Sequence, residues 1–180
     1  HDCLFPSLLV PITGEERGWC ALDQAIEIAR HEQGHIYGLH IVPSEDRKTS
    51  KEVLAISIEF DRRCKAAGIQ GEFAIETGDI PRKISERARW IDLAVINLLN
   101  PPGSEPISRL KSPFRTIIRQ CSRPILAVPK VATKMNRALL AYDGSPKADE
   151  ALFVSAYLAA RWGSSLVVMP VVESEHSGSE

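Results

Sequence analysis

The feature that most constrains the fold is a regular alternation of short apolar runs with longer amphipathic segments. LAVIN (93–97) is a continuous apolar run that ends on the polar Asn97, and PILAVP (124–129) is apolar throughout, which is typical of strands that are covered on both faces. Strands are expected at 7–14, 35–43, 72–79, 93–97 and 124–129. Since helical periodicity lies between them, the pattern predicts an α/β fold: a five-stranded parallel sheet with right-handed crossovers and helices on both faces.

Four helices are expected between these strands. They are Cys20 to Arg30, Ser50 to Ala67, Ile80 to Trp90, and a short helix that starts at Pro113. The first places Leu22, Ala25, Ile26 and Ala29 on one face, and Gly34 is expected at its C-terminal end. The second should turn Val53, Leu54, Ile56 and Phe60 inward. Asp79 and Ser112 are suited to cap the third and fourth helices.

A long Pro/Gly/Ser-rich loop joins the strand 93–97 to the helix at Pro113. In open α/β sheets, ligands bind at the carboxyl ends of the strands near the point where the strand order reverses, and a helix N-terminus there favours anions. The sequence therefore predicts that a phosphate, if one is bound, lies at the end of this loop.

Composition excludes several classes of protein. The 180 residues carry 22 basic and 23 acidic side chains, so no overall field recruits nucleic acid or a membrane surface. The four cysteines form no CxxC pair, which argues against a zinc or redox site and fits a reducing cytoplasm. No apolar run has the length of a membrane span. Because the chain begins with His1, we expect an excised fragment of a longer protein.

The residues DLAVIN, the loop ending in SRLKSPF, and TIIRQCSRPILAVP resemble the C-terminal part of a universal stress protein domain. The Thr77-Gly78-Asp79 turn also matches the family pattern, so the resemblance covers residues 7 to 129. It implies an adenine-nucleotide α-hydrolase-like sheet with strand order 3-2-1-4-5. Family members often dimerise through the final strand, here Ile125 to Val128, and some bind ATP or AMP between the first and fourth strands.

The resemblance also implies a set of nucleotide-site residues. These are Ile12, Thr13, Val42, Asn97, Asn100, Lys111 and Ser112, with Asp143 in the second copy described below. Where nucleotide-binding members have glycines in the phosphate loop, this chain has Asn97, Asn100 and Lys111, and only Ser112 is retained. Asparagine is a partial substitute for glycine because it tolerates left-handed backbone conformations.

The chain contains an internal repeat at an offset of about 130 residues, by which Leu9 matches Leu139 and Gly14 matches Gly144. We therefore expect a universal stress protein-like domain at 1–130, a linker at 131–136, and the first part of a second copy at 137–180. At the position where the family usually has an acidic residue, the second copy has Asp143 and the first copy has Thr13. Such a partial copy cannot bury its apolar faces alone, so Val167, Val168, Val171 and Val172 are expected to pack on the first domain or on another chain.

Two clusters invite a functional interpretation. The basic residues Arg109, Lys111, Arg115, Arg119 and Arg123 fit either a phosphate clamp or a solvated helix face, and the second is the commoner case. They do not alternate with a series of aromatic residues, which argues against a single-stranded nucleic-acid platform. His31 and His35 are four apart, but Gly34 ends the helix between them, so no metal pair is expected. His40 should find a local partner.

No catalytic constellation is visible, so the sequence predicts a protein that is not an enzyme. The function expected is a cytoplasmic, self-associating stress-response or regulatory domain, a homodimer with degenerate ATP or AMP binding. The alternative is the cytoplasmic regulatory part of a membrane transporter or antiporter, because tandem copies can follow such proteins. An ATP-using enzyme of the same fold is the third hypothesis.

Overall fold

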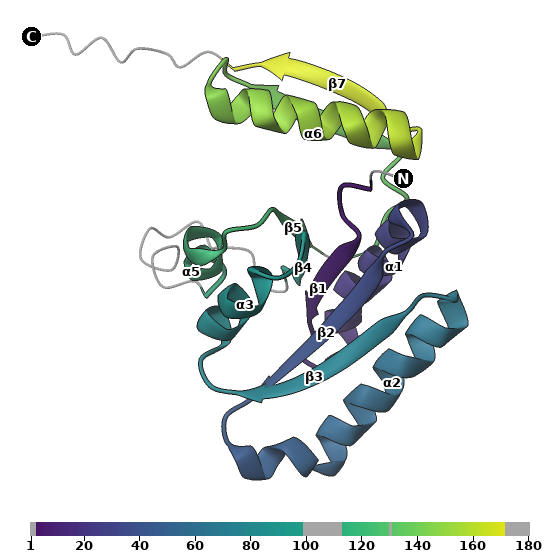
Figure 1. Cartoon of the computed structure of the whole chain (residues 1–180), viewed down its shortest axis with the longest axis vertical. Helices are drawn as coiled ribbons and strands as arrows, with labels where there is room; N and C mark the ends of the chain where they lie inside the picture. Colours follow the sequence, from purple (N-terminus) through teal and green to yellow (C-terminus); the bar gives the residue numbers. More distant parts are fainter. Residues whose placement is uncertain (1–2, 99–112, 130, 172–180) are drawn as a thin grey trace, which may run out of the picture. The chain divides into compact units, whose positions relative to one another are not determined.

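The computed structural model describes residues 3–98, 113–129 and 131–171, and it divides the chain into two units, 1–132 and 133–180 (Figure 1). The first unit contains β1 (Ser7–Pro11), the 3-10 helix η1 (Glu16–Trp19), α1 (Cys20–Glu32), β2 (His35–Val42), the 3-10 helix η2 (Glu45–Thr49), α2 (Lys51–Ala67), β3 (Gly71–Thr77), α3 (Ile80–Ala88), β4 (Leu93–Asn97), α5 (Pro113–Gln120) and β5 (Ile125–Val128). The second contains β6 (Arg137–Tyr142), α6 (Pro146–Trp162) and β7 (Ser165–Pro170).

The first unit is built on a five-stranded parallel sheet of order β3-β2-β1-β4-β5. The predicted fold class and strand order are therefore confirmed. In the central strand, Leu9 is paired with Tyr37 of β2 on one side and with Ala94 of β4 on the other. The chain moves outward from β1 to β3, returns through α3 to β4, and continues to β5, so the order reverses between β1 and β4.

Helices cover both faces of this sheet, as two neighbouring residues of β2 show. A Cβ added at Gly38 would lie 2.7 Å from the ring of Phe60 in α2. The next residue, Leu39, faces the other way and joins the cluster that contains Ile84 of α3 and Ile117 of α5. The sheet is thus buried on both sides, which explains why its strands are continuously apolar.

Helix α1 buries the face that the sequence predicted, since Leu22, Ala25, Ile26 and Ala29 are all buried. In α2, Val53 and Phe60 are buried as expected, but the prediction for Leu54 is wrong because its side chain is 49% exposed. The buried strip of α2 is narrow: it consists of Val53, Phe60 and Cys64. Leu54 is rotated by about 100° from Val53, which turns its side chain away from that strip.

Two predicted helix ends also need correction. The left-handed residue that ends α1 is Gln33, with φ 50°, and not Gly34. Gly34 instead lies close to the N-terminal segment, where a Cβ would meet the carbonyl oxygen of Pro6 at 3.2 Å. Helix α3 begins as predicted, with the Asp79 side chain accepting a hydrogen bond from the Arg82 amide at 3.1 Å, but it ends at Ala88, two residues before Trp90.

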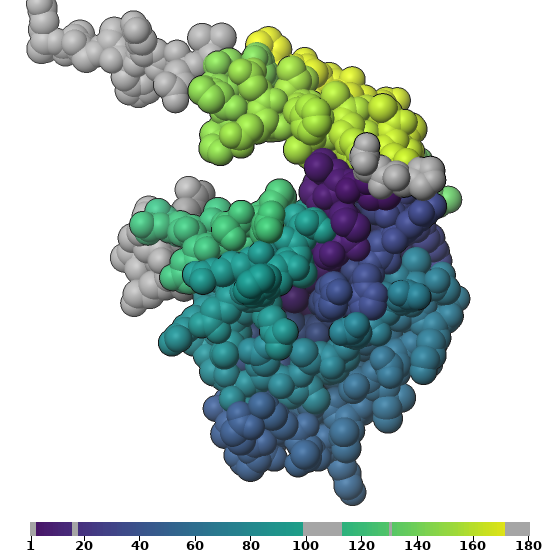
Figure 2. All heavy atoms as spheres, in the orientation of Figure 1, coloured from purple at the N-terminus to yellow at the C-terminus, as the bar shows by residue number. Residues whose placement is uncertain are grey.

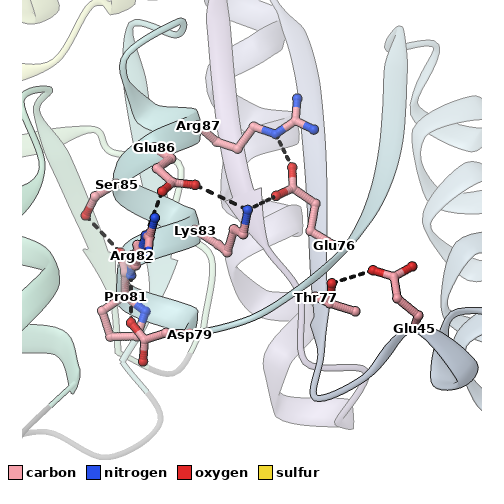
Figure 3. Close-up of polar contacts among 10 residues, drawn as sticks. All are labelled: Glu45, Glu76, Thr77, Asp79, Pro81, Arg82, Lys83, Ser85, Glu86 and Arg87. Carbon is pink, nitrogen blue, oxygen red and sulfur yellow. Dashed lines mark hydrogen bonds and ion pairs between the residues drawn. The ribbon is translucent and has the colours of Figure 1, made fainter.

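An ion-pair network fixes α3 against β3 (Figure 3). Glu76 of β3, whose side chain is 18% exposed, is paired with Arg87 and with Lys83 at 3.2 Å. Partial burial favours a raised pKa for Glu76, but hydrogen bonds from Arg87 and Lys83 outweigh it and lower the pKa. The three side chains stabilise the return of the chain toward β4.

The second unit is a single β-α-β element in which β6 and β7 are parallel. Ser145 caps α6 by accepting a hydrogen bond from the Ala148 amide at 3.2 Å, and Gly163 ends it with φ 69°. Val167, Val168 and Val171 are 59%, 45% and 43% exposed, while Val172 lies outside the described residues. The division between the units falls after Ala132, within the predicted linker 131–136.

Candidate functional site

The predicted nucleotide-site residues of the first unit lie along the carboxyl edge of its sheet. Ile12 is three residues beyond Leu9, and Asn97 is three residues beyond Ala94, the partner of Leu9 in β4. Both therefore follow the two strands between which the strand order reverses, which is where ligands bind in sheets of this type. Asn100, Lys111 and Ser112 lie outside the described residues.

Ile12 and Val42 contribute backbone rather than exposed side chains to this edge. Both side chains are buried, at 3% and 4% exposure. The Ile12 amide donates to the carbonyl oxygen of Leu39 at 2.9 Å, and the Ile12 carbonyl oxygen is 2.7 Å from Nδ1 of His40. This contact confirms the expected local partner of His40. It also ties the end of β1 to β2.

Thr13 is exposed, and its side chain bends back toward its own loop. The Thr13 hydroxyl accepts a hydrogen bond from the Glu15 amide at 3.4 Å. A Cβ at Gly18 would be 2.6 Å from that hydroxyl, so the turn into η1 requires a glycine there. Gly14, with φ 86°, lies next to Thr13, and its Cα faces Ile56 of α2.

A pocket of about 470 Å³ lies between this loop and α2. Its lining residues are Thr13, Gly14, Glu15, Trp19, Glu52, Ala55, Ile56 and Glu59. Ala55, Ile56 and Glu59 follow Glu52 by three, four and seven residues. These four residues therefore lie on one side of α2. With three glutamates and apolar side chains, the lining suits the uncharged, hydrogen-bonding part of a ligand better than it suits a phosphate.

Glu59 is held in its charged form by two arginines. Its carboxylate accepts hydrogen bonds from Arg62 at 2.7 Å and from Arg63 at 2.6 Å, and these bonds lower the pKa of Glu59 to about 2. Arg63 also bonds Asp23 at 2.9 Å and lies 4.9 Å from the centre of the Trp19 ring. This network fixes the wall of the pocket.

We expect Glu59→Gln to lower the free energy of unfolding at pH 7 by about 1 kcal/mol or less, because the ion pairs are partly solvated. A carboxyl whose pKa falls from 4.5 to about 2 on folding contributes stability above pH 4.5, and loses it as the pH falls toward 2. The difference between the wild type and the variant should therefore vanish near pH 2, as measured by urea unfolding at several pH values.

The matched control is Glu15→Gln, a change in the same pocket at a glutamate for which the described residues show no ion pair. It should change stability little at any pH. A Glu59→Gln deficit that persists unchanged below pH 2 would contradict the role of the two arginines.

Asp143, the predicted acidic residue of the second copy, bonds its own turn. Its carboxylate accepts a hydrogen bond from the Ser145 amide at 2.9 Å, and hydrogen bonds from the side chain and backbone of Ser145 lower its pKa. This arrangement accounts for Asp143 as a turn residue at the start of α6. Asp143 belongs to the second unit, whereas Thr13 and Asn97 belong to the first.

Of the basic set, Arg109 and Lys111 lie outside the described residues, whereas Arg115, Arg119 and Arg123 are exposed. Arg115 and Arg119 lie on α5, and Arg123 follows that helix. Sequence reasoning missed the α2 wall of the pocket, including Glu52, Ile56 and Glu59. Their common side of α2 was visible in the spacing, but nothing local indicated that this side faces Thr13.

Comparisons with known proteins place this geometry in a fold family. No protein-family model and no curated protein matches the chain. Among solved structures, a universal stress protein in complex with cAMP has a TM-score of 0.59 at 22% identity, over 71% of this chain and 98% of that chain. One from Lactobacillus plantarum has a TM-score of 0.56 at 14% identity, over 71% and 99% of the two chains.

A universal stress protein from Archaeoglobus fulgidus has a TM-score of 0.78 at 20% identity, over 96% of this chain and 68% of that chain. The chain therefore has the fold of universal stress proteins, and the predicted resemblance is confirmed for the fold.

In the described ranges, none of the helices combines the length and apolarity that a membrane crossing requires. Within those ranges, no group of three or more His, Cys, Asp or Glu side chains is arranged to hold a metal ion.

Proposed function

We propose that the chain is a non-enzymatic stress-response domain that binds an adenine nucleotide at the carboxyl edge of the five-stranded sheet. The observation that supports this most directly is the pocket beside Thr13, because it is lined by the loop that follows β1, one of the two strands between which the strand order reverses. A solved neighbour of the same fold is a complex with cAMP. Since the sequence predicts no catalytic constellation, the proposal is limited to binding.

The proposal assigns the two ends of the nucleotide to different surroundings. The base fits the pocket lined by Thr13, Trp19 and Ile56, where glutamate oxygens can accept hydrogen bonds from an exocyclic amine. The phosphates are directed away from the glutamates and toward the start of α5, whose helix dipole favours anions. Arg115 is exposed in the first turn of that helix.

Self-association through β5 is part of the same proposal. This strand lies at the edge of the sheet and pairs with β4 alone among the described strands. An edge strand presents unpaired backbone groups to a further strand, which can come from a second copy.

The test is calorimetric titration of the chain with ATP, AMP, cAMP and adenosine, with and without magnesium. Thr13→Asp gives the first copy the carboxylate that the second copy has at Asp143, and should tighten the binding of all four by about tenfold through a charged hydrogen bond. Asn97→Asp adds a negative charge at the end of β4. It should weaken the phosphate-bearing ligands by about tenfold while leaving adenosine unchanged.

Thr13→Ser is the control for Thr13→Asp, because it keeps a hydroxyl and adds no charge. Asn136→Asp is the control for Asn97→Asp, because it makes the same charge change in the linker. Both should leave the titrations unchanged. Heat from none of the four ligands, with wild type and Thr13→Asp alike, would refute the nucleotide proposal. Equal weakening of ATP and adenosine by Asn97→Asp would contradict the assignment of the phosphates.

A further inference from the structure

Three glutamates line the pocket beside Thr13, and the structure engages their carboxylates differently. Glu15 follows the end of β1 by four residues, whereas Glu52 and Glu59 belong to α2, which lies at the outer surface of the first unit (Figure 2). A carboxylate that already accepts hydrogen bonds from its own fold has less capacity left for a ligand. The partners of the three carboxylates therefore indicate which of them can contact a bound base.

The two glutamates of α2 are held by their own surroundings. Oε1 of Glu59 accepts hydrogen bonds from Arg62 at 2.7 Å and from Arg63 at 2.6 Å, and Oε2 accepts one from Arg62 at 2.7 Å. Hydrogen bonds from the backbone amide of Glu52 itself and from the Ser50 side chain lower the pKa of Glu52. Both carboxylates thus serve the packing and the N-terminal turn of α2.

The carboxylate of Glu15 has no such role. Glu15 occupies the N-cap position of η1, yet its side chain makes no capping hydrogen bond. The contact of Glu15 within the loop is made by its backbone amide, which donates to the Thr13 hydroxyl at 3.4 Å. None of the side chains that the structure describes gives the Glu15 carboxylate a hydrogen bond or an ion pair. Because the side chain is exposed and lines the pocket, a ligand can reach it.

An ionised carboxylate at this place distinguishes between purine bases. It offers acceptors only, so it can bind the exocyclic amine that adenine carries at C6. Guanine and hypoxanthine have a carbonyl oxygen at C6, and two acceptors that face each other lose the hydrogen bond and repel. Trp19 and Ile56 supply apolar surface for the ring, which every purine shares, so they do not discriminate in this way.

We propose that Glu15 is the specificity-determining residue of the pocket, and that its carboxylate selects a 6-aminopurine over a 6-oxopurine. This assignment rests on the proposed function, because it requires the base to lie in the pocket. It adds a selectivity that the fold alone does not supply, since a site that hydrogen-bonds a donor on its ligand rejects the analogue without that donor.

The test is calorimetric titration of the intact chain with adenosine, inosine and purine riboside, the last of which has no substituent at C6. The wild type should bind adenosine about tenfold more tightly than inosine, with purine riboside between them. Glu15→Gln keeps the size of the side chain and replaces one acceptor by an amide donor. It should weaken adenosine, strengthen inosine and bring the ratio of their affinities to about one.

Two further variants separate the role of Glu15 from a general loss of charge. Glu150→Gln removes a carboxylate of α6 in the second unit, where Glu150 is paired with Lys147 at 2.8 Å, and it should leave all three titrations unchanged. Glu52→Gln makes the same change on the opposite wall of the pocket, and it should leave the ratio of adenosine to inosine affinity unchanged. Circular dichroism checks that every variant is folded.

The possible results distinguish this assignment from the proposed function. Absence of binding with all three nucleosides would refute both together. Adenosine binding with the same preference in the wild type and in Glu15→Gln would keep the pocket as a nucleotide site and overturn the role of Glu15 alone. A preference that changes with Glu52→Gln and not with Glu15→Gln would also overturn it, because the base would then be read from α2.

Discussion

Replacing Phe60 by alanine should lower the free energy of unfolding of the first unit by about 3 to 5 kcal/mol. Phe60 is fully buried, and its ring lies 5.1 Å from the ring of Phe73. It covers two positions of the sheet that lack side chains, Gly38 and Gly71, where an added Cβ would lie 2.7 and 3.0 Å from its ring atoms. Because glycines line the cavity on the sheet side, the backbone cannot collapse into the space. Urea unfolding measures the loss.

Ile58→Ala on the same helix is the control. Ile58 is 69% exposed, so its removal should change stability by about 0.5 kcal/mol or less. A loss below about 1.5 kcal/mol for Phe60→Ala would contradict the packing of α2 on β2 and β3, since it would mean that the site repacks easily.

The sequence predicted the elements that depend on local pattern. Continuous apolar runs identified the buried strands, and the spacing of Leu22, Ala25 and Ala29 identified the buried face of α1. The same reasoning failed for Leu54, because the width of a buried strip depends on the surface that the helix packs against. For α2 that surface is made by Gly38 of β2 and by Gly71 and Phe73 of β3.

Buried polar residues were also beyond the sequence analysis. Gln24 and Glu32 of α1 are 3% and 1% exposed. Glu32 accepts a hydrogen bond from the Phe5 amide at 3.1 Å, a residue 27 positions earlier in the chain. A carboxylate in the last turn of a helix looks solvent-exposed in a periodicity analysis, and only the path of the N-terminal segment makes it a buried acceptor.

The candidate site was also predicted only in part from the sequence. Its position at the ends of β1 and β4 followed from the strand order, which the resemblance to universal stress proteins supplied. The pocket wall on α2 did not follow, because it joins segments that are distant in sequence.

Gly14→Ala should lower the free energy of unfolding by about 2 to 4 kcal/mol, because a left-handed backbone strain adds to overpacking. Gly14 has φ 86°, and an added Cβ would lie 2.3 Å from Cδ1 and 2.7 Å from Cγ1 of Ile56. The added methyl group forces the end of β1 away from α2, and since Thr13 precedes Gly14 the pocket changes shape with it. Urea unfolding measures the stability, and the nucleotide titrations report on the pocket.

Gly68→Ala separates the cost of backbone strain from the cost of overpacking. Gly68 ends α2 with φ 69°, and nothing lies within 4 Å of an added Cβ, so this substitution should cost only the backbone strain, about 1 to 2 kcal/mol. The double variant Gly14→Ala/Ile56→Ala provides space for the new methyl group and should be less destabilised than the two single losses added together. Additive losses would mean that Ile56 moves aside freely, and that strain in the β1 loop alone explains the requirement for glycine.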